Sequence, residues 1–205
     1  MKDLKGTVRR GKLAILFPLF ALGLLVACAD HHRVASRLVE LDSLVDACPD
    51  SALAILDTLG NEGYDEFNRM YLELLRGKAM NKAYVKFTSD SAMLEVARYF
   101  DLHGDRNQQM LAYYVLGCSY RDLGDAPQAI EVYQRAVECA DTLREETDFR
   151  TLSCIYSQMA DVYNRQLALG EETECRKQSI KYSLLLNDST NAAYDYCVLA
   201  GSYIL

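Results

Sequence analysis

The chain has 205 residues, half of them hydrophobic and a quarter charged, which is the composition of a folded protein that can bury a core. Its 22 basic and 29 acidic residues give a formal net charge of −7. Residues 1–27 hold five of the basic residues and one of the acidic ones, so the remainder has 17 basic and 28 acidic residues and a net charge of −11. A body this acidic repels a phosphate backbone, which excludes nucleic acid as a partner.

The chain begins with the basic segment MKDLKGTVRRGK, and the apolar segment LAILFPLFALGLLV follows at residues 13–26. This order is typical of a secretory signal. A membrane-spanning helix needs about 20 apolar residues. Here the apolar run contains Pro18 and Gly23 and meets a charge at Asp30, so we expect a cleaved signal.

The four residues LVAC at the end of this run, with Cys28 last, resemble the lipobox of bacterial lipoproteins. In that family the signal is cut before the cysteine, whose thiol then carries a diacylglycerol. The resemblance implies a signal peptide at 1–27, a lipidated Cys28 and a linker at 28–33. Each buried CH₂ of an acyl chain adds about 0.8 kcal/mol of membrane affinity. The alternatives are an uncleaved anchor helix, or a cysteine that follows an ordinary signal by chance.

Residues 34–105 read as divergent helices of a repeat protein. Apolar residues recur at helical spacing in RVASRLVELDSLVDA, and Pro49 starts a further helix. We expect two more helices, from about Asp65 to Tyr84 and from about Ser89 to Phe100.

Residues 106–205 contain a repeated pattern, which is clearest in YYVLGCSYRDLGDAPQAIEVYQRA at 113–136. Gly124-Asp125 breaks a first helix, and Pro127 suits the first turn of a second. The segment resembles the tetratricopeptide repeat, in which aromatic and small residues recur at fixed offsets over about 34 residues. The residues on those offsets are Tyr113, Leu116, Gly117, Tyr120, Ala129, Tyr133 and Ala136.

The pattern returns in YSQMADVY at 156–163, and its second helix, at about 171–186, follows a turn predicted to be some three residues longer. The pattern begins a third time in YCVLAGSY at 196–203. We therefore expect an all-α chain of nine helices in antiparallel pairs. The resemblance implies that these pairs stack into a right-handed superhelix, an α-solenoid whose last repeat is incomplete. The alternative is an ordinary helical bundle in which the spacing is coincidental.

The segments LVAC, DACPDSALAIL, TSDS and RDLGDAPQAI make nearly the whole chain similar to lipoproteins of gut Bacteroidetes. In that group further repeats, a membrane helix and a coiled coil commonly follow, sometimes with a DNA-binding end. Here AGSYIL falls inside the first helix of a repeat, without a capping helix. We expect either a longer protein or self-association through this last helix.

The residues outside the packing pattern offer no catalytic motif. GxSxG, HExxH, P-loop and GxGxxG sequences are missing, and the cysteines lack metal-binding spacing. His31 and His32 read as linker, His103 as a non-catalytic residue, and most cysteines after Cys28 as small packing residues. We expect no enzyme activity, no cofactor and no metal.

Function is therefore expected on the concave surface that the first helix of each repeat lines, where a protein or peptide partner would bind. The candidate groove residues are Tyr114, Arg121, Asp122, Asp161, Asn164 and Arg165, with Leu111, Cys118, Cys154 and Ser157 beside them and Lys78 and Lys82 upstream. Tyrosine suits such a role because it offers contact area and a hydroxyl at low entropic cost.

The expected function is that of a protein-interaction scaffold in the bacterial cell envelope, lipid-anchored on the non-cytoplasmic side of a membrane, with the outer membrane preferred to the inner. One alternative is the sensory half of a longer membrane signalling protein. Others are a glycan-capture lipoprotein, which the lack of tryptophan disfavours, and an outer-membrane assembly lipoprotein.

Overall fold

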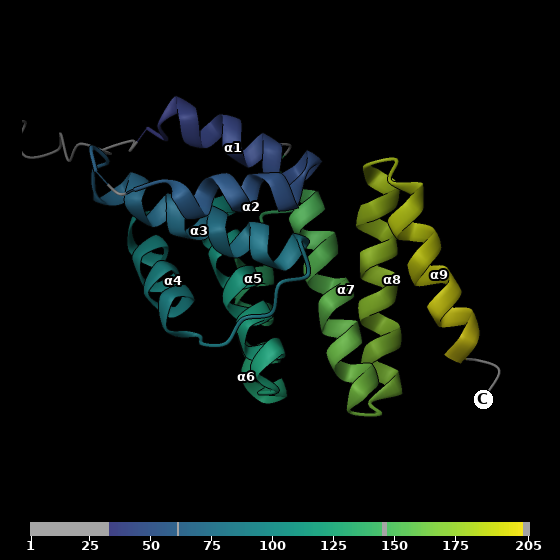
Figure 1. The fold of residues 1–205 in the computed structure, drawn as a ribbon. Helices are drawn as coiled ribbons and strands as arrows, with labels where there is room; N and C mark the ends of the chain where they lie inside the picture. The colour runs from purple at the N-terminus through teal and green to yellow at the C-terminus, as the bar shows by residue number, and fades with distance from the viewer. Residues whose placement is uncertain (1–32, 61, 145–146, 203–205) are drawn as a thin grey trace, which may run out of the picture. The chain divides into compact units, whose positions relative to one another are not determined.

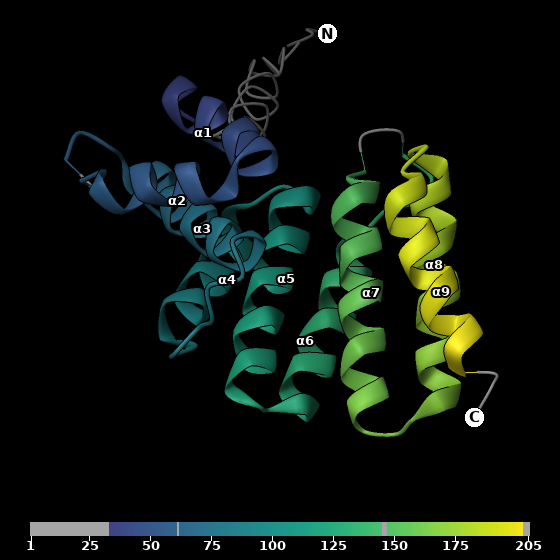
Figure 2. The same ribbon diagram turned by 45° about the vertical axis from the view of Figure 1, so that its right-hand side comes forward.

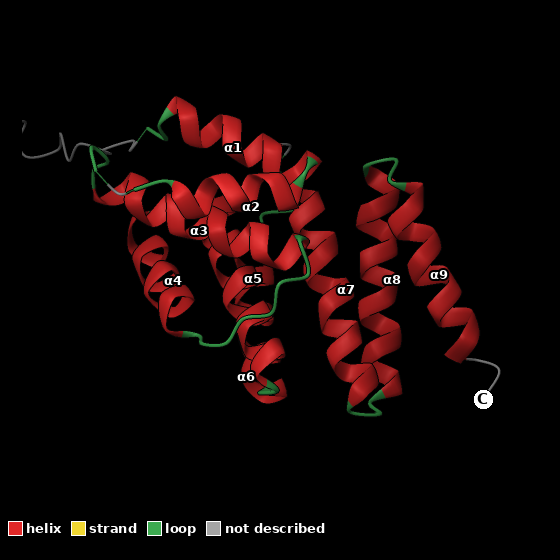
Figure 3. Cartoon of the chain, in the orientation of Figure 1, coloured by secondary structure: helices red, strands yellow, loops and turns green. Residues whose placement is uncertain are grey.

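The computed structural model describes residues 33–60, 62–144 and 147–202, and the described residues from Val34 onward form one compact unit. Within these residues every regular element is an α-helix (Figure 3). The prediction of an all-α chain with nine helices is confirmed for this part of the chain. The predicted signal peptide and Cys28 lie outside the described residues.

The helices follow one another along the chain, as Figure 1 shows. They are α1 (Ser36–Ala47), α2 (Pro49–Thr58), α3 (Glu66–Lys82), α4 (Ser91–His103), α5 (Arg106–Leu123), α6 (Ala126–Cys139), α7 (Phe149–Arg165), α8 (Leu169–Leu185) and α9 (Ser189–Ser202).

The helix ends lie close to the predicted ones where the sequence has strong signals. Asp105 and Gln108 form a capping box at the start of α5, each side chain accepting a hydrogen bond of 2.9 Å from the other residue's backbone N–H. Gly124 ends α5 with a φ of 81°, in the left-handed region that glycine adopts without strain. The predicted break at Gly124-Asp125 is confirmed.

The turn between α7 and α8 is shorter than predicted. It comprises residues 166–168, one residue more than the turn between α5 and α6, and α8 starts at Leu169. Leu167 takes the left-handed conformation, with a φ of 60°, so it closes α7 as Gly124 closes α5. The sequence gives no sign of this, because leucine rarely adopts that conformation.

Small residues let the two helices of a pair approach closely. The Tyr133 side chain of α6 packs directly on Gly117 of α5, where a Cβ atom would overlap the ring. Gly77 of α3 is covered in the same way, since a Cβ there would lie 2.5 Å from Sδ of Met93 in α4. Figure 2 shows the resulting arrangement for α7 and α8, which run side by side in opposite directions.

The odd-numbered helices are also neighbours of one another, since α1 contacts α3, α3 contacts α5 and α5 contacts α7. One hydrophobic core runs through the helices from Leu38 of α1 to Tyr182 of α8. Ile180, Ala192 and Leu199 are buried outside this core, between α8 and α9. None of the helices in the described ranges combines the length and apolar character that crossing a bilayer requires.

Candidate functional site

Polar side chains connect each odd-numbered helix to the next through hydrogen bonds and ion pairs. We call this set the polar band. It comprises Asp42 and Asp46 of α1, Lys78, Asn81 and Lys82 of α3, Tyr114, Arg121 and Asp122 of α5, Ser157, Gln158 and Asp161 of α7, Arg176 of α8 and Asp195 of α9.

Two lysines and two aspartates join α1 to α3. Nζ of Lys78 lies 2.6 Å from Oδ1 of Asp42 and 3.0 Å from Oδ1 of Asp46, and Nζ of Lys82 lies 2.7 Å from the latter atom. Burial opposes ionisation of Lys78 and Asp46. The opposite charges outweigh it, raising the pKa of Lys78 and lowering that of Asp46. Both partners are therefore charged at neutral pH.

Arg121 connects three helices in the middle of the band. Its Nη2 lies 3.2 Å from Oδ1 of Asn81 in α3, and its Nη1 donates to Oε1 of Gln158 in α7. Nε and Nη2 also donate to Oδ1 of Asp122, at 2.9 and 2.7 Å. Nδ2 of Asn81 donates to the hydroxyl of Tyr114 at 3.1 Å. Five side chains are thus held in one defined arrangement.

Arg176 connects α7, α8 and α9 at the other end of the band. Its Nη1 lies 2.7 Å from Oδ1 of Asp195, and its Nη2 pairs with Oδ1 of Asp161. Arg176, Asp195 and Glu172 are each 1% exposed. Burial opposes the charge of Arg176, but Asp161 and Asp195 outweigh it and raise its pKa. The Nε atom of Arg176 and Oε1 of Glu172 lie 3.7 Å apart and have no hydrogen-bond partner.

The predicted groove residues divide into two groups. Tyr114, Arg121 and Asp122 lie together in the middle of the band and are mostly buried, Tyr114 being 8% exposed. Asp161 pairs with Arg176.

The other two, Asn164 and Arg165, are exposed at the end of α7, where Nδ2 of Asn164 donates to Glu172 at 2.8 Å. Helix α7 takes part in both clusters, because Gln158 accepts a hydrogen bond from Arg121 and Asp161 pairs with Arg176. Whether these residues bind a partner stays a prediction.

Sequence reasoning missed the residues that tie the groups together: Asn81, Gln158, Glu172, Arg176 and Asp195. One signal was present, because Glu172 and Arg176 stand four residues apart on one helix. The partners on other helices gave no signal, since their pairing depends on the tertiary arrangement.

The cysteines serve mainly as packing residues, as predicted, although not all of them do. Cys118, Cys139 and Cys175 are buried, Cys154 is partly buried, and Cys48 and Cys197 are exposed. Burial raises the pKa of the Cys118 thiol to about 11, so it is protonated at neutral pH.

His103 is exposed at the end of α4, with its ring centroid 4.6 Å from that of Tyr99. In the part of the chain that the structure describes, no group of three or more His, Cys, Asp or Glu side chains is arranged so that it could hold a metal ion.

The chain was compared with protein-family models, with curated proteins and with solved structures, and none of them matches it. The assignment of a function therefore depends on the residues and their geometry.

Proposed function

We propose that the chain is a lipid-anchored binding module of the bacterial cell envelope, in which tetratricopeptide-like helix pairs hold a protein partner against the polar band. The observation that carries the proposal is the continuity of this band. Neighbouring odd-numbered helices contribute side chains to it. The single side chain of Arg121 contacts both α3 and α7.

The packing within the helix pairs supports the proposed repeat family. In α5 and α6, Tyr133 covers Gly117, which are two of the positions on which the resemblance rests. Ala129, Ala136 and Ala160 are fully buried, as small residues between closely packed helices should be. Continued stacking of such pairs would give the right-handed superhelix expected of the family.

The chemistry of the band suits a peptide or a helix with charges of both signs. It offers carboxylates, ammonium groups, a guanidinium and amides. Several of them are partly exposed, including Asp46 with a side chain 45% exposed and Lys82 with one 33% exposed. Because these side chains are already paired, their rotamers are fixed before binding and less entropy is lost when a partner arrives.

The proposed anchor is a diacylglycerol on Cys28, which would keep the module at the non-cytoplasmic side of a membrane, the outer one in our proposal. A single acyl chain gives only reversible binding to a bilayer, and two or more make it durable.

Site-specific photo-crosslinking in the native cell tests the binding role. A photoreactive amino acid replaces Arg165 or Lys82, which are in or beside the band, and Arg98 on α4 serves as the control, since it is exposed and outside the band. We expect one protein adduct from Arg165 and Lys82, absent from Arg98, and reduced when Cys28→Ser removes the anchor. The same adduct from all three positions, or none from Arg165 and Lys82, would contradict the proposal.

A further inference from the structure

The turn that closes α3 holds a tyrosine in a conformation that tyrosine does not favour. Tyr84 has a φ of 57°, in the left-handed region, and is 94% exposed. The left-handed residue that closes α5 is Gly124 and the one that closes α8 is Asn187, and both residue types adopt this region readily. Tyr84 therefore adds backbone strain to the fold while its side chain buries almost no surface, and strained residues of this kind gather at functional sites.

The strained residue belongs to an exposed tip between α3 and α4, residues 84–86 with the sequence Tyr-Val-Lys, which we call the α3–α4 tip. Lys82, a residue of the polar band, ends α3 just before the tip. Phe87, just after it, is buried, and its backbone N–H donates to Oδ2 of Asp122 in α5 at 3.2 Å. Since Asp122 also belongs to the polar band, the tip is fixed to the band on both sides, where the connection from α3 to α4 passes beside α5 (Figure 1).

The tip presents an aromatic ring, an aliphatic side chain and a positive charge to the solvent, because Val85 and Lys86 are exposed like Tyr84. Among the described residues Lys86 has no ion-pair partner, whereas Lys82 lies 2.7 Å from Asp46. A carboxylate from another molecule would complete the charge of Lys86. An apolar side chain beside that carboxylate would cover Tyr84 and Val85.

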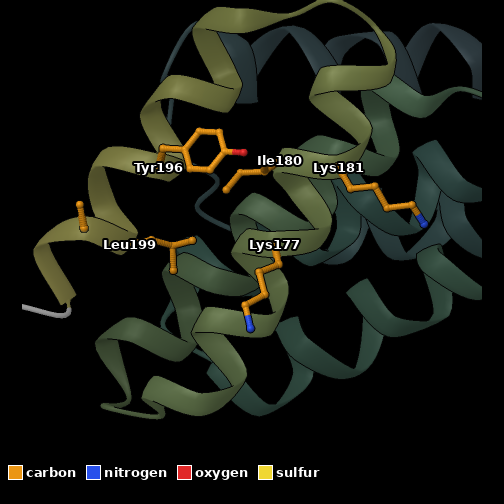
Figure 4. Close-up of a pocket in the computed structure, with 6 residues that line it drawn as sticks. Lys177, Ile180, Lys181, Tyr196 and Leu199 are labelled. Atoms are coloured by element: carbon orange, nitrogen blue, oxygen red, sulfur yellow. The ribbon is translucent and has the colours of Figure 1, made fainter.

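The groove between α8 and α9 differs from the tip in the state of its charges (Figure 4). Its two lysines already interact within the chain, since Lys177 lies 2.7 Å from Glu174 and Lys181 lies over the Tyr182 ring, 4.9 Å from its centroid. Of the lysines in the described ranges, Lys86 is the one whose charge remains for a partner.

The position of the tip favours a protein over a membrane surface. The proposed anchor joins the folded unit just before α1, where the backbone N–H of Ala35 donates to Oδ1 of Asn68 in the first turn of α3 at 2.7 Å. The tip follows the last turn of α3, a helix of 17 residues, which places it about 25 Å further along the helix axis. The anchor and the tip thus belong to opposite ends of α3.

We propose that the α3–α4 tip is a contact site for the protein partner of the polar band, and that it takes a segment in which a carboxylate stands next to an apolar side chain. The apolar side chain packs on Tyr84 and Val85, and the carboxylate pairs with Lys86. The buried Phe87 holds the tip in place before binding, so less entropy is lost when the partner arrives. This inference rests on the proposed function, because it assigns part of the contact surface of the same partner.

Photo-crosslinking through position 165 in the native cell reports partner binding, and variants of the tip are compared by the amount of adduct per amount of chain. We expect this adduct to fall at least tenfold in Tyr84→Asn and in Lys86→Glu. The matched controls are Leu102→Asn, at a side chain of α4 that is 79% exposed, and Arg98→Glu, at an exposed charge of α4. Both controls should leave the adduct unchanged.

Two further measurements separate a binding role of Tyr84 from a structural one. Asparagine suits the left-handed region, so Tyr84→Asn should unfold at the same temperature as the unchanged protein or at a higher one. An aromatic photoreactive amino acid in place of Tyr84 should give the same protein adduct as position 165 does.

Four results would overturn the proposal. An adduct from position 165 that is undiminished in Tyr84→Asn would remove the tip from the contact surface and leave the proposed function standing. The lack of any adduct from positions 165 and 82 in the otherwise unchanged protein would overturn both. A lower unfolding temperature of Tyr84→Asn would give this residue a structural role. An adduct with lipid from position 84 would make a membrane the occupant of the tip.

Discussion

Arg176 brings one positive charge into a site that holds three carboxylates. Glu172 and Asp195 are 1% exposed, and Asp161 lies on the neighbouring α7. Desolvating several charges costs free energy that their mutual attraction repays only with good geometry, so such a cluster favours one arrangement of its helices more than it adds stability. We therefore expect Arg176 to hold α9 against α7 and α8 in one arrangement, through its pairs with Asp195 and Asp161.

Removing the charge of Arg176 should destabilise the protein far more than removing the charge of Lys177, the next residue along the chain. Arg176→Met leaves the buried carboxylates without a cation, and we expect a loss of about 3–5 kcal/mol in the free energy of unfolding. Lys177→Met, at a side chain that is 54% exposed, should cost no more than about 1 kcal/mol. Urea denaturation of both variants measures the difference.

The Arg176→Lys variant provides the control, because it keeps a cation beside Asp161, Glu172 and Asp195. It should lose less stability than Arg176→Met does. An equal loss in the two variants would assign the loss to packing instead of charge.

The buried thiol of Cys118 predicts a loss of stability at high pH. Its pKa is about 11 in the folded protein against 9.0 for the free group, with burial as the main cause. The folded protein favours the neutral thiol, so the protonated Cys118 contributes to the free energy of unfolding. This contribution is complete below about pH 9 and is lost as the pH rises through about 11.

Urea denaturation at about pH 8 and at about pH 10.5 tests this prediction. The Cys118→Ala variant should lose a smaller share of its stability between the two pH values than the unchanged protein. The exposed Cys197 serves as the matched control, and Cys197→Ala should lose as much as the unchanged protein. If Cys118→Ala also loses as much, the alkaline loss comes from other groups.

At the scale of the helices, stability depends on close approach within each pair. Gly117 admits the Tyr133 ring, and Gly77 admits Met93 together with Val115. In a helix interior, glycine costs about 1 kcal/mol relative to alanine, so only such an approach makes it favourable there.

Substituting alanine at two helical glycines separates propensity from packing. Gly117→Ala should destabilise the protein by about 1–3 kcal/mol, because the new methyl group overlaps Tyr133 and overpacks the core. Gly170→Ala, in α8, meets no atom within 4 Å and should leave stability unchanged or raise it by up to about 1 kcal/mol. Thermal unfolding of both variants measures the two effects, and an equal change in both would show that Gly117 matters through propensity alone.

Helix ends were predictable from the sequence only where residues with a defined local preference mark them. Asp105 and Gly124 were of this kind, because a capping side chain and a left-handed glycine act within a few residues. Tyr84 and Leu167 close α3 and α7 with φ values of 57° and 60°. Neither residue type favours this conformation, so the sequence did not indicate these ends. Both residues are more than 80% exposed.

For the whole molecule, the helical periodicity was sufficient to predict nine helices and their pairing. The candidate site was less predictable. Arg121 and Asp122 could be placed on the proposed groove from the repeat pattern. The contacts of Arg121 with Asn81 and Gln158 bridge about 40 residues of sequence, and only the stacking of the helices brings these side chains together.

Cys28 would decide where the module acts, because it would carry the lipid anchor. The most direct test is the intact mass of the protein purified from the membrane fraction of its native cell. The proposal predicts a chain that lacks residues 1–27, begins at Cys28 and carries the added mass of a diacylglycerol, which Cys28→Ser abolishes. An unmodified chain that still begins at Met1 would contradict it.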